Sequence, residues 1–347
     1  MLHTAESVTS GHPDKICDQI SDAILDEYLK QDPKSRVAVE TFGSHGLLVI
    51  GGEVTSSGKV DAQKIAKKIY KNIGYPDNLK ILANIIQQSP DIAQGVDTGG
   101  AGDQGIMYGY ATNETEEYLP LPVVLAHRLT KGLEELRRHH PKFQWLRPDG
   151  KSQVTVENNK IRTVLISCQH DEKISKPEIE NLLEKYLIKK LVGGNYEILV
   201  NPTGKFITGG FHADTGLTGR KIMVDTYGGL IPHGGGCFSG KDPTKVDRSA
   251  AYMCRFVAKN IVANHYAEKC LVSVAYAIGK AEPLMVEINT FNTGEDKKIR
   301  RLVRKNFDFS PNSIIQRLNL QKPIYLQTAA YGHFGKQNLP WEEIIKI

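Results

Sequence analysis

The residues best suited to chemistry lie in a glycine-rich stretch between Asp225 and Tyr252. Glycines leave the backbone free to bend tightly and to approach a ligand without a Cβ in the way. The stretch contains Gly228, Gly229, Gly234, Gly235, Gly236 and Gly240. Lys241 and Lys245 follow them and supply two cations. Backbone amides and lysines in this order are typical of a cradle for a polyphosphate.

One known phosphate-binding loop can be excluded. Residues 235–241 fit the spacing G-x-x-x-x-G-K, in which Ser or Thr must follow the lysine to hold magnesium. This chain has Asp242 there, so the nucleotide-triphosphatase interpretation fails at its last position. A flexible glycine loop beside surface lysines is the simpler alternative. The two lysines, together with Asp242 and Asp247, favour the polyphosphate cradle.

A second candidate group stands at the start of a predicted helix. Pro13 suits the first helical position, and the apolar residues that follow recur on one face to about Tyr28. His12 and Asp14 therefore lie at the N-terminal rim, where free N–H groups and the helix dipole favour anions. His12 can donate to a phosphate oxygen there, and Asp14 is tolerable mainly if it faces a cation such as magnesium. Taken alone, both residues are also explained as ordinary helix caps.

Two carboxylates lie in a predicted hairpin over residues 36–54. Alternating residues place Glu40 on the face opposite the valines, where an exposed strand glutamate is the usual explanation. Glu53 follows a Gly-Gly pair that brings the backbone close to a neighbour. This position makes Glu53 the better candidate for a ligand contact, although a plain turn carboxylate fits the local sequence as well.

The elements that must position these residues repeat along the chain. The order helix, hairpin, helix occurs three times, with hairpins that start near residues 36, 152 and 271, spaced by roughly 120 residues. The repeat predicts three similar α+β units, each with helices on one face of a sheet. Another copy of the chain is the simplest cover for the opposite face. Five glycines from Gly95 to Gly105 predict a mobile lid or linker.

Composition excludes several classes of protein. At 40% hydrophobic and 24% charged residues, with no apolar run of about 18 residues, the chain is predicted to be a soluble cytoplasmic protein. Its 44 basic and 39 acidic residues are too evenly balanced to indicate a nucleic-acid surface. Five cysteines without a C-x-x-C pair argue against a disulfide framework and a structural zinc site, so we expect free thiols.

The polar residues at glycine-rich or turn positions balance cations against carboxylates. They are His12, Asp14, Glu53, Asp103, Lys151, Asp214, Arg220, Lys221, Lys241, Lys245 and Asp247. Lysines and arginine suit a triphosphate, and aspartates suit magnesium ions that share phosphate oxygens. The sequence has no G-x-S-x-G, H-E-x-x-H or kinase motif set, so nucleophilic and zinc hydrolysis lack support. The predicted chemistry therefore works without a protein nucleophile.

Four motifs make the chain resemble the S-adenosylmethionine synthase family, also called the methionine adenosyltransferases. In order they are GHPDK at 11–15, GDQG at 102–105 followed by YGYATNET at 108–115, GLTGRK at 216–221, and the cradle at 233–252. The match runs from Glu6 to about Trp341. It implies an α+β fold of three interleaved βαββαβ-type domains, which we expect at 1–97, 98–208 and 209–347. It also implies a homodimer or homotetramer whose active sites are shared between subunits.

The resemblance implies the conversion of ATP, L-methionine and water into S-adenosylmethionine, phosphate and diphosphate, with Mg²⁺, two ions per site, and K⁺ as cofactors. This activity agrees with the residue inventory. A thioether sulfur is already nucleophilic and has no proton to lose. Its attack on the ribose C5′ therefore needs alignment and a stabilised tripolyphosphate leaving group, but no general base. The tripolyphosphate is then hydrolysed.

Site residues are implied by the motif match, position by position. The implied catalytic residues are His12, Lys151, Asp214, Arg220 and Lys241. ATP contacts are implied for these five and for Asp149, Lys205, Phe206, Lys221 and Cys237, with the ring of Phe206 facing adenine. Methionine contacts are implied for Glu53, Gln94, Asp214 and Lys245. The implied metal ligands are Asp14 and Asp247 for magnesium and Glu40 for potassium.

The chain departs from the family pattern at four places. Lys205 stands where arginine is usual, so a planar bidentate grip becomes a point charge. Phe211-His212-Ala213 replaces Pro-x-Gly, and Cys237 replaces alanine. The segment 96–102 is several residues shorter than the family's gating loop, so we expect a lid that closes less completely. This short lid is the one feature that supports an alternative function, a weakly active homologue that binds nucleotide or methionine as a partner subunit or sensor.

Overall fold

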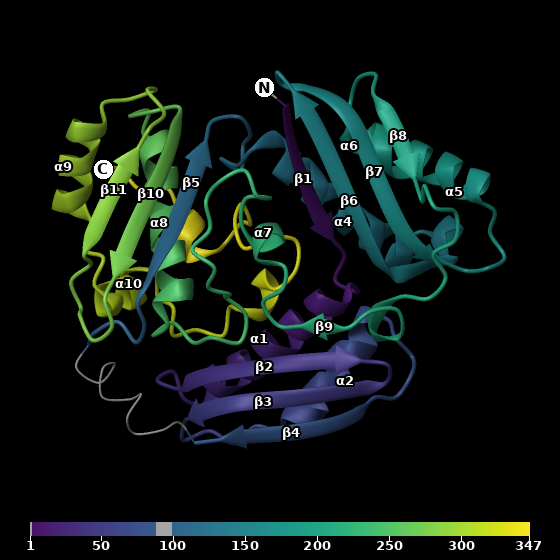
Figure 1. Cartoon of the computed structure of the whole chain (residues 1–347), viewed down its shortest axis with the longest axis horizontal. Coiled ribbons are helices and arrows are strands. Elements are labelled where there is room, and N and C mark those ends of the chain that lie inside the picture. Colours follow the sequence, from purple (N-terminus) through teal and green to yellow (C-terminus); the bar gives the residue numbers. More distant parts are fainter. Residues whose placement is uncertain (1, 88–98) are drawn as a thin grey trace.

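The computed structural model describes residues 2–87 and 99–347, in which helices and strands alternate along the chain (Figure 1). The strands are β1 (Leu2–Val8), β2 (Arg36–Ser44), β3 (Leu47–Thr55), β4 (Lys80–Ile86), β5 (Gly105–Thr112), β6 (Leu146–Glu157), β7 (Lys160–His170), β8 (Glu197–Val200), β9 (Gly216–Leu217), β10 (Lys269–Tyr276) and β11 (Met285–Asn289). The helices are α1 (Pro13–Gln31), α2 (Ala62–Ile73), α4 (Leu121–His139), α5 (Lys176–Leu183), α6 (Lys189–Leu191), α7 (Ile222–Asp225), α8 (Val246–Ala263), α9 (Asp296–Asn306) and α10 (Pro311–Arg317). Residues 95–98 of the predicted lid, and Gln94 before them, lie outside the described residues.

The predicted order of helix, hairpin and helix is confirmed three times. The sets are α1, β2–β3 and α2; α4, β6–β7 and α5; and α8, β10–β11 and α9. Helices begin where local signals predict them. Pro13 stands in the first turn of α1, and the Asp61 side chain caps α2 by accepting from the Lys64 N–H. The α+β fold class is therefore confirmed.

Each hairpin also pairs with one strand from a remote part of the chain. β9 pairs with β2, β1 with β6, and β5 with β10, all antiparallel. The resulting sheets have the orders β4-β3-β2-β9, β1-β6-β7-β8 and β11-β10-β5. Each predicted segment thus gives one strand to the sheet of another, so the three units are interleaved. The boundaries at 1–97, 98–208 and 209–347 themselves stay a prediction.

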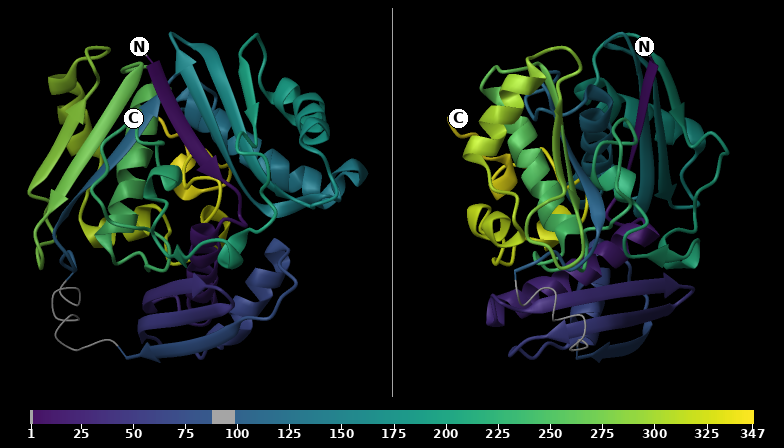
Figure 2. Two further views of the ribbon diagram at one scale, coloured as in Figure 1. Left: turned by 45° about the vertical axis from the view of Figure 1, so that its right-hand side comes forward. Right: turned by 60° about the vertical axis from the view of Figure 1, so that its left-hand side comes forward.

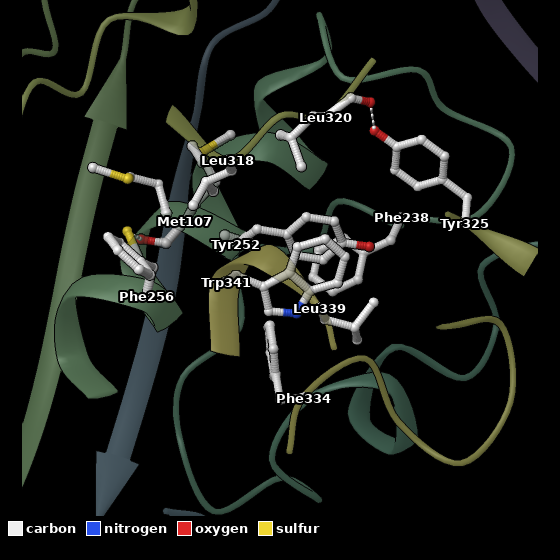
Figure 3. Packing of buried hydrophobic residues seen from close by; sticks show 14 of the residues in the cluster. Met107, Phe238, Tyr252, Phe256, Leu318, Leu320, Tyr325, Phe334, Leu339 and Trp341 are labelled. Carbon is white, nitrogen blue, oxygen red and sulfur yellow. Dashed lines mark hydrogen bonds between the residues drawn. The ribbon is translucent and has the colours of Figure 1, made fainter. Parts of the chain in front are cut away.

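The C-terminal segment returns to the centre of the molecule and packs against α8 (Figures 1 and 2). The indole of Trp341 stacks on the ring of Tyr252 in α8, with ring centroids 3.7 Å apart (Figure 3). Phe238 and Phe334 pack edge-on against the same tyrosine. Because Phe238 belongs to the glycine-rich stretch, this aromatic cluster anchors the candidate phosphate cradle to the core.

The sheet β4-β3-β2-β9 has one covered face and one open face. α1 and α2 lie on the face that buries Val37, Val39, Leu48 and Ile50. The opposite face exposes Phe42, Leu82 and Ile86. The strand register places these three side chains on one side, because Phe42 faces Val49 and Val49 faces Leu82. The prediction of helices on one face of a sheet is thus confirmed here.

Two compositional predictions can be compared with the structure. None of the helices within residues 2–87 and 99–347 combines the length and the apolar character that a membrane crossing requires. All five cysteines are free thiols, as predicted, and they are Cys17, Cys168, Cys237, Cys254 and Cys270.

Candidate active site

The first wall of the candidate site is the N-terminus of α1. His12 is the N-cap, and its Nδ1 accepts a hydrogen bond from the Asp14 N–H at 3.2 Å. Tyr75 donates to the carbonyl of Gly11 at 2.7 Å, which fixes the turn before the helix. Burial, and next the charge of Lys221, lower the pKa of His12 to about 3, so the imidazole is neutral. Because Nδ1 is an acceptor, the ring proton sits on Nε2, which can donate to an anion.

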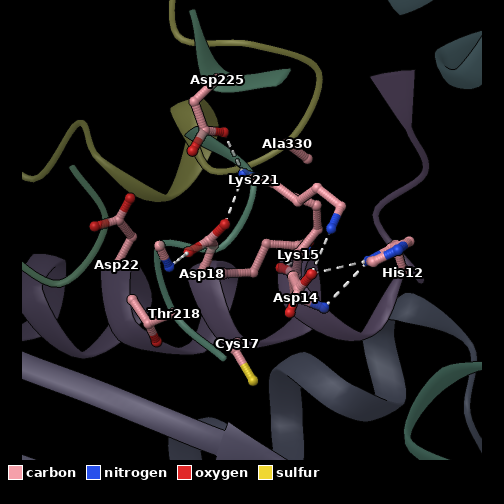
Figure 4. Close-up of polar contacts among 12 residues, drawn as sticks. His12, Asp14, Lys15, Cys17, Asp18, Asp22, Thr218, Lys221, Asp225 and Ala330 are labelled. Carbon is pink, nitrogen blue, oxygen red and sulfur yellow. Dashed lines mark hydrogen bonds and ion pairs between the residues drawn. The ribbon is translucent and has the colours of Figure 1, made fainter. Parts of the chain in front are cut away.

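Asp14 holds the cations of the loop that follows β9 beside His12 (Figure 4). Its Oδ2 accepts from Lys221 Nζ at 2.6 Å, and its Oδ1 accepts from the Leu217 N–H at 3.0 Å. The Arg220 Nε lies 3.9 Å from Oδ1. Burial favours the neutral acid, but these hydrogen bonds outweigh it and hold the pKa of Asp14 below its usual value. The carboxylate is therefore ionised, and both its oxygens are engaged.

Arg220 and Lys221 lie in the loop that follows β9, and Lys241 lies in the loop that precedes α8. Both loops are attached to the β2 side of the sheet β4-β3-β2-β9, which we call the first sheet. β9 pairs with β2 at one end of this side. Farther along the same side, Ala38 forms a bridge with Lys241, and the Val39 N–H donates to the Gly240 carbonyl at 3.0 Å. β2 therefore brings the Lys241 loop beside the loop that follows β9.

Two glycines permit this close approach. Gly219 has a φ of +79°, and a Cβ on it would lie 2.4 Å from the Cβ of Cys237 in the other loop. Gly240 has a φ of +80°, and a Cβ on it would lie 2.0 Å from the carbonyl oxygen of Val39. A side chain at either position would strain the backbone and push the loops apart.

Lys241 pairs with Asp247 in the first turn of α8, at 2.7 Å between Nζ and Oδ2. Both side chains are only partly buried, so the pair remains accessible to solvent. Lys245 pairs with Asp242, whose carboxylate also accepts from the Val37 N–H at 2.7 Å. The aspartate that excludes a nucleotide-triphosphatase loop is thus a buried anchor that joins this loop to β2.

Asp14 and Asp247 fit a magnesium site that a ligand completes. No group of three or more His, Cys, Asp or Glu side chains in the described residues could hold a metal by itself. Magnesium takes one or two carboxylates and fills its shell with phosphate oxygens and water. Each aspartate supplies one carboxylate, and each is paired with a lysine that could take a phosphate oxygen in exchange.

A second wall is formed by β6 and the segment after β8. Lys151 is exposed on β6 opposite Val8, and its charge adds to the effect of burial on the pKa of His12. Asp149 Oδ2 accepts from the Gly210 N–H at 2.9 Å, while Asp149 Oδ1 is buried with no partner among the described residues. Burial raises the pKa of this carboxyl to about 6. A buried acceptor without a donor is uncommon, which makes this oxygen a candidate for a contact that the protein alone does not supply.

Three predicted residues lie at the margin of this wall. Phe206 is half-buried, and its N–H donates to His170 Nε2 at 3.1 Å. Lys205 is largely exposed and pairs with Glu172 at 3.8 Å. Asp214 is exposed, and its carboxylate accepts from the N–H of the next residue at 2.8 Å. The ion pair of Lys205 is therefore with Glu172, which is not one of the predicted site residues.

Two predicted carboxylates stand on the open face of the first sheet. Glu53 faces Ala38 on β2, two residues from Glu40, so both glutamates point to the side that the helices leave uncovered. The charge of Glu40 adds to the effect of burial in raising the pKa of the Cys237 thiol. Glu40 is therefore close to the Lys241 loop.

The departure from the family pattern at Phe211 is accommodated by the first sheet and α2. The Phe211 ring is buried and stacks on Tyr70 of α2, with ring centroids 5.7 Å apart. Gly43 makes room for it, because a Cβ there would lie 2.2 Å from the Phe211 ring. His212 Nε2 lies 3.0 Å from Asp77 Oδ2. These contacts anchor the segment that leads to β9.

The sequence prediction omits a set of buried aspartates that lie along α1 after Asp14. Asp18, Asp22 and Asp26 are buried and accept hydrogen bonds from the backbone of other segments. With Asp14 they recur every four residues, so their common face could be read from the predicted helix. Their burial could not, since carboxylates are almost never buried unless they are paired.

Three family models match the chain in succession. They describe the N-terminal, central and C-terminal domains of S-adenosylmethionine synthetase, over residues 1–92, 98–206 and 208–343. Proteins named S-adenosylmethionine synthase from Mesoplasma florum, Petrotoga mobilis and Staphylococcus epidermidis are each 50% identical to this chain. Each match covers 100% of this chain, and 98%, 97% and 96% of the respective relative.

Proposed function

The chain belongs to the S-adenosylmethionine synthetase family, and we propose on this premise that it joins ATP to L-methionine at the site around the start of α1. The enzyme is a methionine adenosyltransferase, a transferase of S-adenosylmethionine biosynthesis and one-carbon metabolism. Its reaction converts ATP, methionine and water into S-adenosylmethionine, phosphate and diphosphate.

The observation that carries this proposal is the arrangement of three cationic side chains on two adjoining loops. Arg220 and Lys221 follow β9, and Lys241 follows Gly240, the last glycine of the glycine-rich stretch. The N-terminus of α1 adds backbone N–H groups and a positive dipole, and neutral His12 adds one more donor. We propose that the triphosphate of ATP binds among these groups.

In the proposed reaction, the methionine sulfur attacks the ribose C5′ and forms the new C–S bond. The C5′–O bond breaks, and its electron pair leaves with tripolyphosphate. Since the sulfur carries no proton, the residues have to align the reactants and stabilise the leaving oxygen. His12 and Lys151 are assigned to that oxygen, and Arg220 and Lys221 hold tripolyphosphate while water cleaves it to phosphate and diphosphate.

Family membership indicates a metal-dependent enzyme, and the assignment of Mg²⁺ and K⁺ is our proposal. Asp14 and Asp247 would hold magnesium together with phosphate oxygens, two ions per site. Bound magnesium neutralises phosphate charge and so makes tripolyphosphate a better leaving group. The lysines now paired with these aspartates would then face phosphate oxygens. Glu40 would bind potassium.

The remaining residues divide between the two substrates. Phe206 would stack on adenine, and its half-buried ring leaves a face for that contact. Other parts of ATP would meet Asp149, Lys205, Asp214 and Cys237. Methionine would be held by Glu53, Gln94, Asp214 and Lys245.

We also propose that a second copy of the chain completes each site. The open face of the first sheet exposes Phe42, Leu82 and Ile86, and Glu40 and Glu53 stand on that same face. A contiguous apolar sheet face typically marks an interface, and a copy related by twofold symmetry could cover it. Residues assigned to potassium and methionine would then lie between subunits. A homodimer and a homotetramer both meet this requirement, and light scattering would distinguish them.

No finding favours the alternative of a weakly active partner subunit. That alternative rests on the short segment 96–102, of which residues 96–98 lie outside the described part of the chain. The cytoplasm stays our predicted compartment.

The proposal is tested by incubating the purified protein with ATP, methionine, magnesium and potassium. We expect S-adenosylmethionine together with equal amounts of phosphate and diphosphate. Omitting magnesium should abolish turnover, and replacing potassium by sodium should lower it. Nucleotide binding without turnover would support the weakly active alternative, and release of ADP would contradict both functions.

A further inference from the structure

Four buried aspartates form a stripe along one face of α1. Asp14, Asp18, Asp22 and Asp26 recur every four residues, and none is more than 6% exposed. Burying a carboxylate is costly unless it is paired or hydrogen-bonded. Each of the four accepts a hydrogen bond from the backbone N–H of another segment. The first of these N–H groups is that of Leu217 in β9, and the next two, of Gly219 and Gly240, belong to the two loops that carry the cations of the proposed site.

Asp18 holds the loop of Lys221. Its Oδ1 accepts from the Gly219 N–H at 2.8 Å, two residues before that lysine. Its Oδ2 accepts from Lys15 Nζ, also at 2.8 Å, and Lys15 donates in turn to Asp225 at the end of α7. One buried network therefore holds the loop on both sides of its exposed cations.

Asp22 holds the loop of Lys241. Its Oδ1 accepts from the Gly240 N–H at 2.8 Å, and the carboxylate accepts two hydrogen bonds from Arg248 at 2.7 and 2.8 Å. Arg248 also donates to the Lys241 carbonyl at 3.1 Å. The backbone is thus held at the residue before Lys241 and at the Lys241 carbonyl, so a shift of this loop would break hydrogen bonds to a buried ion pair.

We propose that Asp18 and Asp22 are positioning residues for tripolyphosphate, which act by holding the two lysine loops at fixed places along α1. Cations that are in place before the ligand arrives stabilise a developing anion without a reorganisation cost. Neither aspartate has to touch a substrate. This inference rests on the proposed function, because Asp18 and Asp22 would position the cations of the same tripolyphosphate site.

Asp26 provides a matched control within the same stripe. Its two carboxylate oxygens accept from the N–H groups of Tyr325 and Leu326, both at 2.9 Å. That segment carries none of the residues assigned to the site. Replacement of Asp18 or Asp26 by Asn keeps the shape of the side chain and removes one of its two acceptors. If Asp18 only stabilised the fold, the two changes should therefore have similar effects on tripolyphosphate binding.

The experiment measures the binding of inorganic tripolyphosphate by calorimetry, together with kcat and KM, for Asp18→Asn, Asp26→Asn and Lys221→Ala. We expect D18N to weaken tripolyphosphate binding about tenfold and to lower kcat by a similar factor, with the KM for methionine within about twofold of the wild type. D26N should stay within about twofold on all three measures, although its Tm also falls because a buried backbone N–H loses its acceptor.

Wild-type binding by D18N, or an equal loss of binding in D26N, would overturn the positioning role even if K221A still binds weakly. If K221A binds tripolyphosphate as tightly as the wild type, the site assignment in the proposed function fails first, and the inference fails with it. Should D18N not fold, hydrogen exchange of the wild-type protein decides the question. Peptides over 216–221 and 236–242 must exchange slowly before tripolyphosphate is added, and fast exchange there contradicts preformed loops.

Discussion

Two groups of ion pairs in this molecule share their chemistry and differ in their surroundings. At the candidate site, Lys221 pairs with Asp14 and Lys241 with Asp247, and the two lysine side chains are 19% and 22% exposed. The second group lies around Glu342 in the C-terminal segment, where the charged side chains are buried.

The C-terminal group is complete by itself. Arg255 donates to both carboxylate oxygens of Glu342, at 3.0 and 2.9 Å, and to the carbonyls of Tyr110 and Tyr118, both at 2.8 Å. A further bond goes to a neighbouring carbonyl, so all the N–H donors of the guanidinium are used. Lys259 donates to Glu342 as well. The Arg255 guanidinium has no donor left for a ligand, and the group serves to fasten the C-terminal segment to α8.

Lys221 at the candidate site shows the opposite condition. Among the described residues it has one hydrogen-bond acceptor, Asp14, so two of its three ammonium protons remain for a ligand. An ion pair that is saturated and dry holds the fold together. In an ion pair that is partly exposed to solvent and has unused donors, the lysine can exchange its carboxylate partner for a phosphate. We therefore expect stability to depend on the first group and activity on the second.

The largest expected effect comes from Glu342→Gln, which leaves Arg255 and Lys259 as buried cations without a carboxylate. Removing one partner of a buried ion pair costs about 3–5 kcal/mol, and we expect a loss of that size in the free energy of unfolding. Urea titration at one protein concentration measures it. Glu157→Gln, in the exposed pair with Arg162, is the control and should cost less than about 1 kcal/mol. Folded E342Q should retain its kcat, and an inactive folded variant would contradict the separation of the two groups.

Lys241→Ala should show the reverse pattern. Loss of a preorganised cation beside a developing anion lowers kcat by about 100-fold or more, whereas loss of an ion pair open to solvent costs less than about 1 kcal/mol of stability. Kinetics and urea titration on the same sample measure both quantities. Lys298→Ala, in the exposed pair with Glu295, is the control and should leave kcat within about twofold. Near-normal turnover of K241A would remove Lys241 from the site.

The smallest expected effect compares a histidine of the site with one of the interior. His12 and His127 are both buried, and burial is the main reason why the pKa of each is lowered to about 3. Between pH 6.5 and about 3 the unfolded chain binds these protons and the folded chain does not. Stability therefore falls as the pH falls, by at most about 1.4 kcal/mol per pH unit for each histidine. His12→Asn and His127→Gln should each reduce this slope.

Tripolyphosphate should distinguish the two histidines. An anion beside His12 favours the imidazolium and raises the pKa of His12. Bound tripolyphosphate should therefore reduce the contribution of His12 to the pH dependence of the free energy of unfolding, which is the share that His12→Asn removes. The share removed by His127→Gln should not change. Unfolding free energies at pH 7, 6 and 5, with and without tripolyphosphate, measure both shares. Equal responses of the two histidines to the ligand would place the phosphates away from His12.

Much of this architecture could be predicted because it depends on short-range signals. Pro13 and Asp61 mark helix starts within a single turn, and apolar periodicity indicates which face of each element is buried. The motif at 216–221 and the glycine-rich stretch likewise identify the two cation-bearing loops from local sequence. His12, Asp14, Arg220 and Lys221 were predicted one by one, and the structure brings them together at the start of α1.

The partner of each segment could not be predicted in this way. An alternating strand pattern indicates a face but not a neighbour, so nothing local announces that β9 joins β2 or that β1 joins β6. The stripe of aspartates on α1 follows from their spacing, whereas the N–H groups of Gly219 and Gly240 reach it only in the folded chain. The sequence alone determined which side chains carry charge and which helix face they share. The tertiary structure decided which charges are buried and which stay open to a ligand, because burial and pairing depend on atoms that distant segments contribute.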